Sequence, residues 1–245
     1  TMVEQKLPNV SMDDDVAYNG LIAILVGVVV VILTALFLYS RSKRTARNSV
    51  LMMGLSESGK TCLFSQLIHG YFVQTFTSIK ENEGKLSIGK ASVRVLDIPG
   101  QERLRLKYFD TFKHTCKGIV YVIDSSTVSK DVKDVAEFLY ILLSDVAIQS
   151  CPLLIACNKQ DEGLAKSAQV VKSILEKEIT TLRVTRSKML DSLDSSGNNK
   201  VFLGNRNGDF KFEDLKYTRV DLAETFCTSK ESSIDKIKSW LEGIC

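Results

Sequence analysis

Apolar runs and helical stripes alternate from residue 48 to the end of the chain. Short apolar runs bounded by turn residues predict buried strands, and stripes that recur every three or four residues predict helices packed on them. The predicted strands cover about 49–54, 84–89, 91–97, 118–124, 152–157 and 217–223. The predicted helices cover about 59–69, 130–146, 164–183 and 232–244. This alternation indicates an α/β fold with a mostly parallel sheet covered by helices on both faces.

Two local features refine this pattern. The runs 84–89 and 91–97 are joined by Gly89 and Lys90, a connection so short that it predicts an antiparallel hairpin. Ser232 or Ser233 is predicted to cap the last helix. Residues 187–216 break the rhythm with clusters of Asp, Ser, Gly and Asn, and they predict an exposed insertion. A small hairpin at 201–203 and 210–212 is expected within it.

The N-terminal part follows a different pattern, because residues 21–39 are continuously uncharged. Nineteen helical residues span roughly 28 Å, close to the hydrocarbon thickness of a bilayer. A buried core helix would carry some polar residues, and a cleaved signal peptide would have basic residues before a shorter core. Here the acids Asp13–Asp15 precede the run and basic residues follow it. The sequence therefore predicts one transmembrane helix at 19–40, with residues 1–18 luminal and the rest cytosolic.

Residues 41–47 form a short basic linker. It fits a stop-transfer flank and also a segment lying on anionic headgroups, and the sequence does not separate the two. The cytosolic domain is predicted to cover 48–245.

Composition narrows the function classes. The chain has 245 residues and a formal net charge of +3, so no strongly basic field indicates direct nucleic-acid readout. Its six cysteines are scattered without C-x-x-C spacing, and several lie in apolar runs. This usage is typical of a reducing compartment, with neither disulfides nor zinc expected.

The stretch 50–62, V-L-M-M-G-L-S-E-S-G-K-T-C, carries the candidate chemistry. It is G-x-x-x-x-G-K-[ST], the phosphate-binding loop, between a strand and a helix. Its glycines let backbone N–H groups and the helix N-terminus face phosphate oxygens. Lys60 is placed to reach the β- and γ-phosphates, and the Thr61 hydroxyl to ligate Mg²⁺. The predicted nucleotide-binding residues here are Gly54, Leu55, Ser56, Glu57, Ser58, Gly59, Lys60, Thr61 and Cys62.

D-I-P-G runs from Asp97 to Gly100, directly after a predicted strand and about forty residues after the phosphate-binding loop. The Asp97 carboxylate can hold Mg²⁺ through water, and the Gly100 N–H can meet a γ-phosphate without a side chain in the way. D-x-x-G is weak alone, but its position makes it a predicted second part of a nucleotide site.

N-K-Q-D at 158–161 follows the next predicted buried strand and is a guanine-reading motif. The Asp161 carboxylate can accept from N1–H and the exocyclic amine, a donor pair that adenine lacks. Asn158 can bond the N7/O6 edge and tie this loop to the phosphate-binding loop, and the Lys159 stem can cover the base. After the last strand, backbone N–H groups of Cys227, Thr228 and Ser229 are weaker candidates for bonding guanine O6.

In this order and spacing, the four elements resemble those of the small GTPases of the Ras/Arf/Sar class. The resemblance covers about 48–245 and implies six strands, five helices, bound GTP or GDP with Mg²⁺, and two switch loops. Switch I would be about 71–83, with Thr77 meeting Mg²⁺ and Thr75 as the alternative. Switch II would be about 98–110.

The membrane segment, K-D-V-A-E-F-L-Y at 133–140, L-I-A-C-N-K-Q-D at 154–161 and L-R-V-T-R-S at 182–187 give a closer resemblance, to the signal recognition particle receptor beta subunits. This resemblance implies the endoplasmic reticulum membrane, and capture of the receptor's alpha subunit in the GTP form during co-translational targeting. The translocon and the ribosome are further candidate partners.

Gln101 stands where Ras-class proteins keep the glutamine that orients the attacking water, so it is the predicted catalytic residue. Ser56 and Glu57 replace small glycines, and Arg103 and Arg105 are expected on a solvated face rather than as a finger. The resemblance therefore implies a GTP-gated binding module with slow or partner-stimulated hydrolysis. Two alternatives stay open: an Arf-like GTPase of vesicle traffic, and an anchor that binds GTP constitutively.

Overall fold

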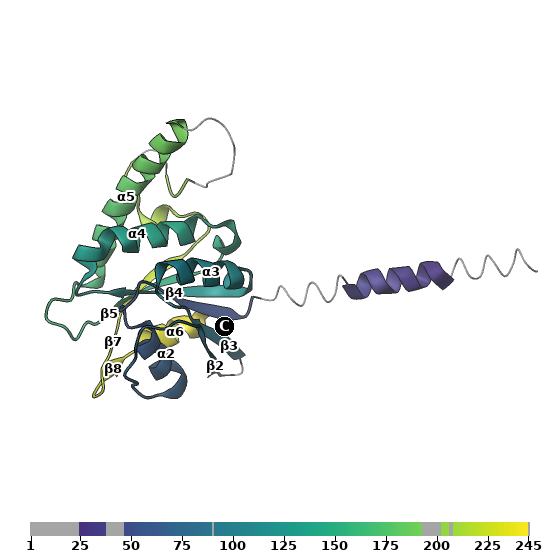
Figure 1. Ribbon diagram of the computed structural model, residues 1–245, viewed down its shortest axis with the longest axis horizontal. Helices are drawn as coiled ribbons and strands as arrows, with labels where there is room; N and C mark the ends of the chain where they lie inside the picture. Colours follow the sequence, from purple (N-terminus) through teal and green to yellow (C-terminus); the bar gives the residue numbers. More distant parts are fainter. Residues whose placement is uncertain (1–24, 38–46, 90, 193–201, 206–207, 245) are drawn as a thin grey trace, which may run out of the picture. The chain divides into compact units, whose positions relative to one another are not determined.

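The computed structural model describes residues 25–37, 47–89, 91–192, 202–205 and 208–244 (Figure 1). It divides into two compact units, residues 1–46 and 47–245. In the first unit, a helix with exposed side chains covers residues 25–37. Within the described ranges, no helix combines the length and the apolar character needed to cross a membrane. The predicted luminal segment 1–18 and both ends of the predicted span 19–40 lie outside those ranges.

The second unit is built on a six-stranded sheet with the order β2-β3-β1-β4-β5-β6. β2 and β3 form the expected antiparallel hairpin, and all other pairs are parallel, which confirms the predicted sheet. The strands are β1 (Ser49–Met53), β2 (Asn82–Ile88), β3 (Ala91–Asp97), β4 (Cys116–Asp124), β5 (Leu153–Asn158) and β6 (Val220–Glu224). The unit begins one residue before the predicted boundary, since Arg47 donates to the Ala147 carbonyl and the Ser150 hydroxyl.

Among the described residues, five helices cover the sheet, with α3, α4 and α5 on one face and α2 and α6 on the other (Figure 1). They are α2 (Lys60–His69), α3 (Glu102–Phe112), α4 (Val128–Ser144), α5 (Ala168–Ser192) and α6 (Asp235–Ile244). α3 lies where the sequence predicted only a switch loop. Phe109 is its one fully buried side chain, so the apolar stripe was too narrow to mark a helix.

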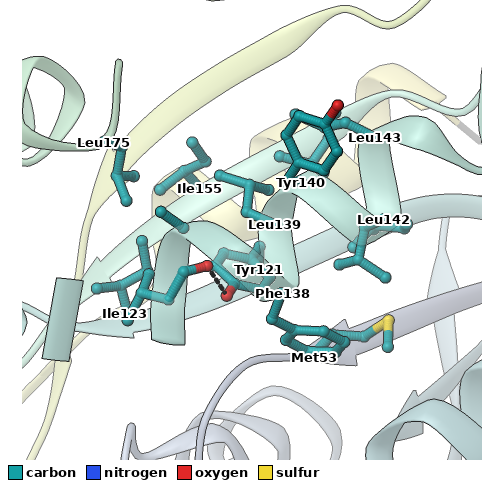
Figure 2. Packing of buried hydrophobic residues seen from close by; sticks show 14 of the residues in the cluster. Met53, Tyr121, Ile123, Phe138, Leu139, Tyr140, Leu142, Leu143, Ile155 and Leu175 are labelled. Atoms are coloured by element: carbon teal, nitrogen blue, oxygen red, sulfur yellow. Dashed lines mark hydrogen bonds between the residues drawn. The ribbon is translucent and has the colours of Figure 1, made fainter. Parts of the chain in front are cut away.

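Each face of the sheet has its own apolar core. The larger core lies under α3, α4 and α5, where Tyr121 of β4 and Phe138 of α4 have ring centroids 5.7 Å apart. Figure 2 shows this packing and the hydrogen bond that the Tyr121 hydroxyl donates to the Val135 carbonyl, at 2.8 Å. The helix predicted at about 164–183 is confirmed as α5, which begins later, at Ala168, and buries Val171, Leu175 and Ile179 fully. These cores hold the carboxyl ends of the parallel strands in fixed positions.

The segment 187–216 differs from its prediction. α5 continues to Ser192, and Leu203, Phe210 and Phe212 are buried in the larger core. An exposed insertion is therefore wrong for these residues, while 193–201 and 206–207 lie outside the described ranges. The expected hairpin is also wrong within the described residues, because Phe212–Asp214 forms a 3-10 turn (η3).

Two further 3-10 turns, η1 and η2, cover Lys113–Thr115 and Val146–Ile148.

The predicted cap of the last helix is wrong. Ser232 and Ser233 form β8, which pairs antiparallel with β7 (Phe226–Cys227). In the first turn of α6, the N–H groups of Ile237 and Lys238 donate to the carbonyl of Ile234, the residue just before the helix. The backbone pairing of a short hairpin thus sets where α6 begins, and it holds the loop 228–231 beyond the carboxyl end of the sheet.

Candidate nucleotide-binding site

The phosphate-binding loop connects β1 to α2 as the sequence predicted, and its glycines have the expected role. Gly54 has φ +144° and Gly59 has φ +84°, both in the region that disfavours side chains. A Cβ at Gly54 would lie 2.2 Å from the Val122 carbonyl oxygen, and one at Gly59 would lie 2.3 Å from Asn158 Nδ2. Glu57 also has a positive φ, of 64°. Only glycine fits the two framing positions, and the loop is closely packed against β4 and β5.

Lys60 is the first residue of α2 and its side chain folds back along the loop. Its Nζ donates to the Leu55 carbonyl at 2.6 Å and to the Ser58 hydroxyl at 3.4 Å. Burial lowers the pKa of Lys60 to about 8, against the opposing effect of the Asp97 carboxylate. The ammonium is therefore held in a poorly solvated position beside the loop. An anion with several oxygens, such as a phosphate chain, would stabilise its charged form.

Thr61 and Asp97 meet as predicted, at the start of α2 and the end of β3. The Thr61 hydroxyl donates to Asp97 Oδ2 at 2.8 Å, and Asn82 Nδ2 donates to the same oxygen at 2.9 Å. Burial raises the pKa of Asp97, and these two hydrogen bonds oppose that effect. The second carboxylate oxygen, Oδ1, is buried and has no hydrogen-bond partner among the described residues.

Ser78 is a residue that the sequence reasoning missed. Its hydroxyl lies 3.2 Å from the Thr61 hydroxyl, within hydrogen-bond distance. Thr77 and the alternative Thr75 line the same pocket. Three hydroxyl residues within four positions give no sequence signal for choosing one, because the path of the switch I segment decides which side chain faces Thr61.

These groups fit a hard divalent cation. Thr61, Ser78 and Asp97 supply two hydroxyls and one carboxylate, all oxygen ligands of the kind that Mg²⁺ prefers. Asp97 brings a buried oxygen without a partner in the described part of the chain. Mg²⁺ keeps several waters and binds to few carboxylates together with substrate phosphates, so one acid is sufficient.

A pocket of about 260 Å³ opens between the phosphate-binding loop and switch I. It is lined by Ser56, Glu57, Gly59, Lys60, Thr61, Thr75, Phe76, Thr77, Ser78, Ile98 and Gly100. Gly100 presses against the loop, since a Cβ there would lie 2.5 Å from the Ser56 nitrogen. The D-I-P-G turn and the phosphate-binding loop therefore touch backbone to backbone, which explains why the turn ends in glycine.

The predicted catalytic Gln101 lies next to this contact. Its side chain is exposed, and its carbonyl accepts from the first turn of α3. Arg103 is exposed as expected, whereas Arg105 places its guanidinium 4.5 Å from the centre of the Phe138 ring. The expectation of a solvated face is therefore wrong for Arg105, which packs against α4 instead.

The N-K-Q-D motif lies at the end of β5, and its asparagine makes the predicted connection. Asn158 is buried, donates from Nδ2 to the Ser58 carbonyl at 2.8 Å and accepts from the Thr225 hydroxyl. Lys159 has φ +63° and its Nζ lies 2.6 Å from Asp124 Oδ2, so its stem is fixed across the strand ends. Asp161 is exposed beyond the end of the strand.

The predicted fourth element, Cys227 to Ser229, lies opposite the phosphate-binding helix. The Cys62 thiol lies 3.6 Å from the Cys227 carbonyl, so α2 and β7 are in direct contact. The Thr228 N–H and hydroxyl both donate to the Glu231 carbonyl, closing the loop between β7 and β8. Ser229 is exposed at its tip. All four motifs thus lie at the carboxyl ends of neighbouring strands, where open α/β sheets bind their ligands.

Known proteins match both the sequence and the fold. The family described as signal recognition particle receptor beta subunit matches residues 45–220. The human signal recognition particle receptor subunit beta is 39% identical over 237 residues, covering 91% of this chain and 86% of its own. The counterpart from Saccharomyces cerevisiae is 29% identical, with 82% and 85% covered.

Solved structures give the same result. A structure of the mammalian signal recognition particle receptor matches with a TM-score of 0.70 and 38% identity, covering 80% of this chain and all of that one. A complex of SRb with GTP and SRX from Chaetomium thermophilum shares the fold, with a TM-score of 0.63 and 22% identity, covering 82% of this chain and all of that one. The chain therefore belongs to the signal recognition particle receptor beta subunit family.

Proposed function

We propose that this chain is the membrane-anchored GTP switch of a signal recognition particle receptor, and that its GTP form captures the alpha subunit during co-translational targeting. The observation that carries this proposal is the convergence of four guanine-nucleotide motifs on one sheet edge in a member of this family. A related protein has been solved as a complex of its GTP form with a partner, SRX. No feature of the site favours the vesicle-traffic alternative.

Different residues would bind the phosphates, the metal ion and the guanine base. The phosphate-binding loop and Lys60 would hold the β- and γ-phosphates, with Thr61, Ser78 and Asp97 around Mg²⁺. Bound Mg²⁺ would neutralise charge that develops on the phosphates. Asn158 and Asp161 would read guanine. Gln101 would orient the attacking water, and hydrolysis would be slow because none of the described residues that line the pocket is an arginine.

We place the anchor in residues 19–40, with the N-terminus in the lumen of the endoplasmic reticulum and residues 48–245 in the cytosol. Support for this comes from the apolar run 21–39 and from the charges on its two sides. The basic residues at 41–47 would lie at the cytosolic headgroups. The translocon and the ribosome remain candidate partners that the alpha subunit would bring close.

A nucleotide-dependent capture experiment tests the switch. The full chain in detergent would be loaded with GDP or with a non-hydrolysable GTP analogue and mixed with purified alpha subunit. We expect capture by the triphosphate form to exceed capture by the GDP form by about tenfold or more, typical of allosteric coupling of 1–3 kcal/mol. Equal capture by both forms would make the chain a constitutive anchor, and no capture would favour the vesicle-traffic alternative.

Thr61→Asn should abolish the difference between the two forms. It removes the hydroxyl that contacts Asp97 and places a bulkier amide in the pocket, so binding of the triphosphate with Mg²⁺ should weaken by at least about tenfold. Thr61→Ser keeps the hydroxyl and is the matched control. Alpha-subunit capture that survives in Thr61→Asn at the level of Thr61→Ser would contradict a GTP-gated switch.

A pair of single substitutions separates Ser78 from Thr77. Because Ser78 contacts Thr61, Ser78→Ala should lower GTP affinity in Mg²⁺ by about tenfold, the cost of one hydroxyl contact to an ion. Thr77→Ala should change it by less than about threefold. Titration with a fluorescent GTP analogue, with and without EDTA, measures both. A larger loss of GTP affinity in Thr77→Ala than in Ser78→Ala would show that Thr77 contacts the metal, as the sequence predicted.

A further inference from the structure

Two cysteines face each other across the nucleotide site from parts of the chain 165 residues apart. Cys62 lies in the first turn of α2, and Cys227 ends β7. The Cys62 sulfur lies 3.6 Å from the Cys227 carbonyl oxygen, and the Cys227 sulfur lies 3.8 Å from the Cys62 carbonyl oxygen. These reciprocal contacts put each thiol against the backbone of the other residue. The two side chains are therefore in the neighbourhood that a disulfide requires without movement of a whole element.

The two thiols differ in access to solvent. Cys62 is 9% exposed, whereas Cys227 is half-buried in the short β7–β8 hairpin. Cys227 is thus the thiol that a reagent in solution can reach, and Cys62 is the sheltered neighbour behind it. That arrangement matches an attacking cysteine next to a resolving cysteine.

From this geometry we infer that Cys62 and Cys227 form a reversible disulfide that locks the nucleotide site when a low-molecular-weight disulfide is in excess. The Cys227 thiolate attacks one sulfur of the reagent, forms a mixed disulfide and releases one thiol. The Cys62 thiolate then attacks the Cys227 sulfur, forms the intramolecular S–S bond and releases the second thiol. The reagent gains two electrons and two protons, and the two cysteines lose them.

The disulfide would slow nucleotide exchange because its two cysteines lie on opposite sides of the nucleotide site. Cys62 immediately follows the Lys60 and Thr61 pair of the phosphate site, and Cys227 opens the loop predicted to face the guanine. A covalent bond between the two cysteines would prevent the start of α2 and the loop after Cys227 from moving apart. A nucleotide loaded before oxidation should leave slowly, and a site oxidised without nucleotide should load slowly. This part of the inference rests on the proposed function, whereas formation of the bond does not.

A second cysteine pair provides an internal control. The Cys151 sulfur lies 3.2 Å from the Cys116 carbonyl oxygen, so this pair is also close, but both side chains are at most 1% exposed. A small disulfide reagent should not reach them while the protein is folded. Selective oxidation of the site pair would therefore reflect exposure and position rather than general oxidation.

The test treats the full chain in detergent with excess oxidised glutathione, followed by alkylation and non-reducing peptide mapping. We expect a Cys62–Cys227 cross-link and an intact mass lower by about two daltons, the mass of the two hydrogen atoms lost. Dithiothreitol should reverse both, Cys227→Ser should give no cross-link, and the Cys116 and Cys151 peptides should stay reduced. A glutathione adduct that persists on Cys227, or no modification, would overturn the inference.

Nucleotide exchange is the second readout. Release of a fluorescent GDP analogue loaded before oxidation should slow by about tenfold or more, in line with the cost of opening a cross-linked region, and recover after reduction. A cross-link that leaves this rate unchanged would overturn the lock. If reduced protein binds no guanine nucleotide, the proposed function fails instead, and the peptide map still reports whether the disulfide forms.

Discussion

Asp161→Asn should exchange the base preference of the site from guanine to xanthine. The carboxylate would accept from N1–H and the exocyclic amine of guanine, and an amide turns one of those acceptors into a donor. Losing one charge-assisted hydrogen bond and placing an amide donor against a guanine donor should weaken GTP binding by about a hundredfold or more. Xanthosine triphosphate, which has a carbonyl in place of the amine, should then bind better than GTP. Competition against a fluorescent nucleotide measures both affinities.

The structure supports this choice of residue. Asp161 follows β5, and its carboxylate is near enough to Cys62 to add to the raised pKa of that thiol. The Asp161 side chain is exposed at the carboxyl edge of the sheet, where α2 also begins. Glu162→Gln is a matched control, since this exposed neighbour lies 4.0 Å from Lys159 and belongs to no motif. Normal GTP affinity in Asp161→Asn would show that another residue reads the base.

The sequence predicted those parts of the site that depend on local backbone geometry. Gly54 and Gly59 occupy conformations and close contacts that exclude other residues. Their spacing, together with Lys60, Thr61 and the flanking strand and helix, therefore identified the loop. Asp97 and Asn158 end buried parallel strands, and the carboxyl ends of such strands meet at one edge. The apolar runs of β1, β4 and β5 are buried on both faces, which makes them easy to recognise.

Other features depended on contacts between distant segments. Ser78 and Thr77 are chemically similar, and only the path of switch I brings Ser78 to Thr61. α3 has too few buried residues to show a helical stripe. The segment 187–216 was predicted to be exposed because Gly, Asn, Asp and Ser cluster in it. Three of its apolar side chains, Leu203, Phe210 and Phe212, are nevertheless buried in the larger core. A local pattern cannot reveal that a few separated apolar residues pack against α5.

Arg183 of α5 explains how that polar segment can pack, and its replacement should destabilise the fold strongly. Its guanidinium donates to the carbonyls of Leu203, Asn205 and Gly208, at 2.8, 3.0 and 2.6 Å. It also lies 4.8 Å from the centre of the Phe202 ring. Arg183→Met keeps an apolar stem but leaves these carbonyls without their donor, so the free energy of unfolding should fall by about 3 kcal/mol or more. For a domain of this size, the melting temperature should fall by about 6–12 °C.

Arg186, one turn further along α5, is the matched control. It pairs with the exposed Glu137 and lies over the Tyr140 ring, so Arg186→Met removes an arginine from the same helix at a solvent-accessible position. Its effect should stay within about 1 kcal/mol. The Arg183 variant should also expose the chain near Gly208 to limited proteolysis, because the segment loses its tie to α5. Equal, small losses of stability in both variants would show that the buried phenylalanines hold the insertion and that Arg183 adds little to them.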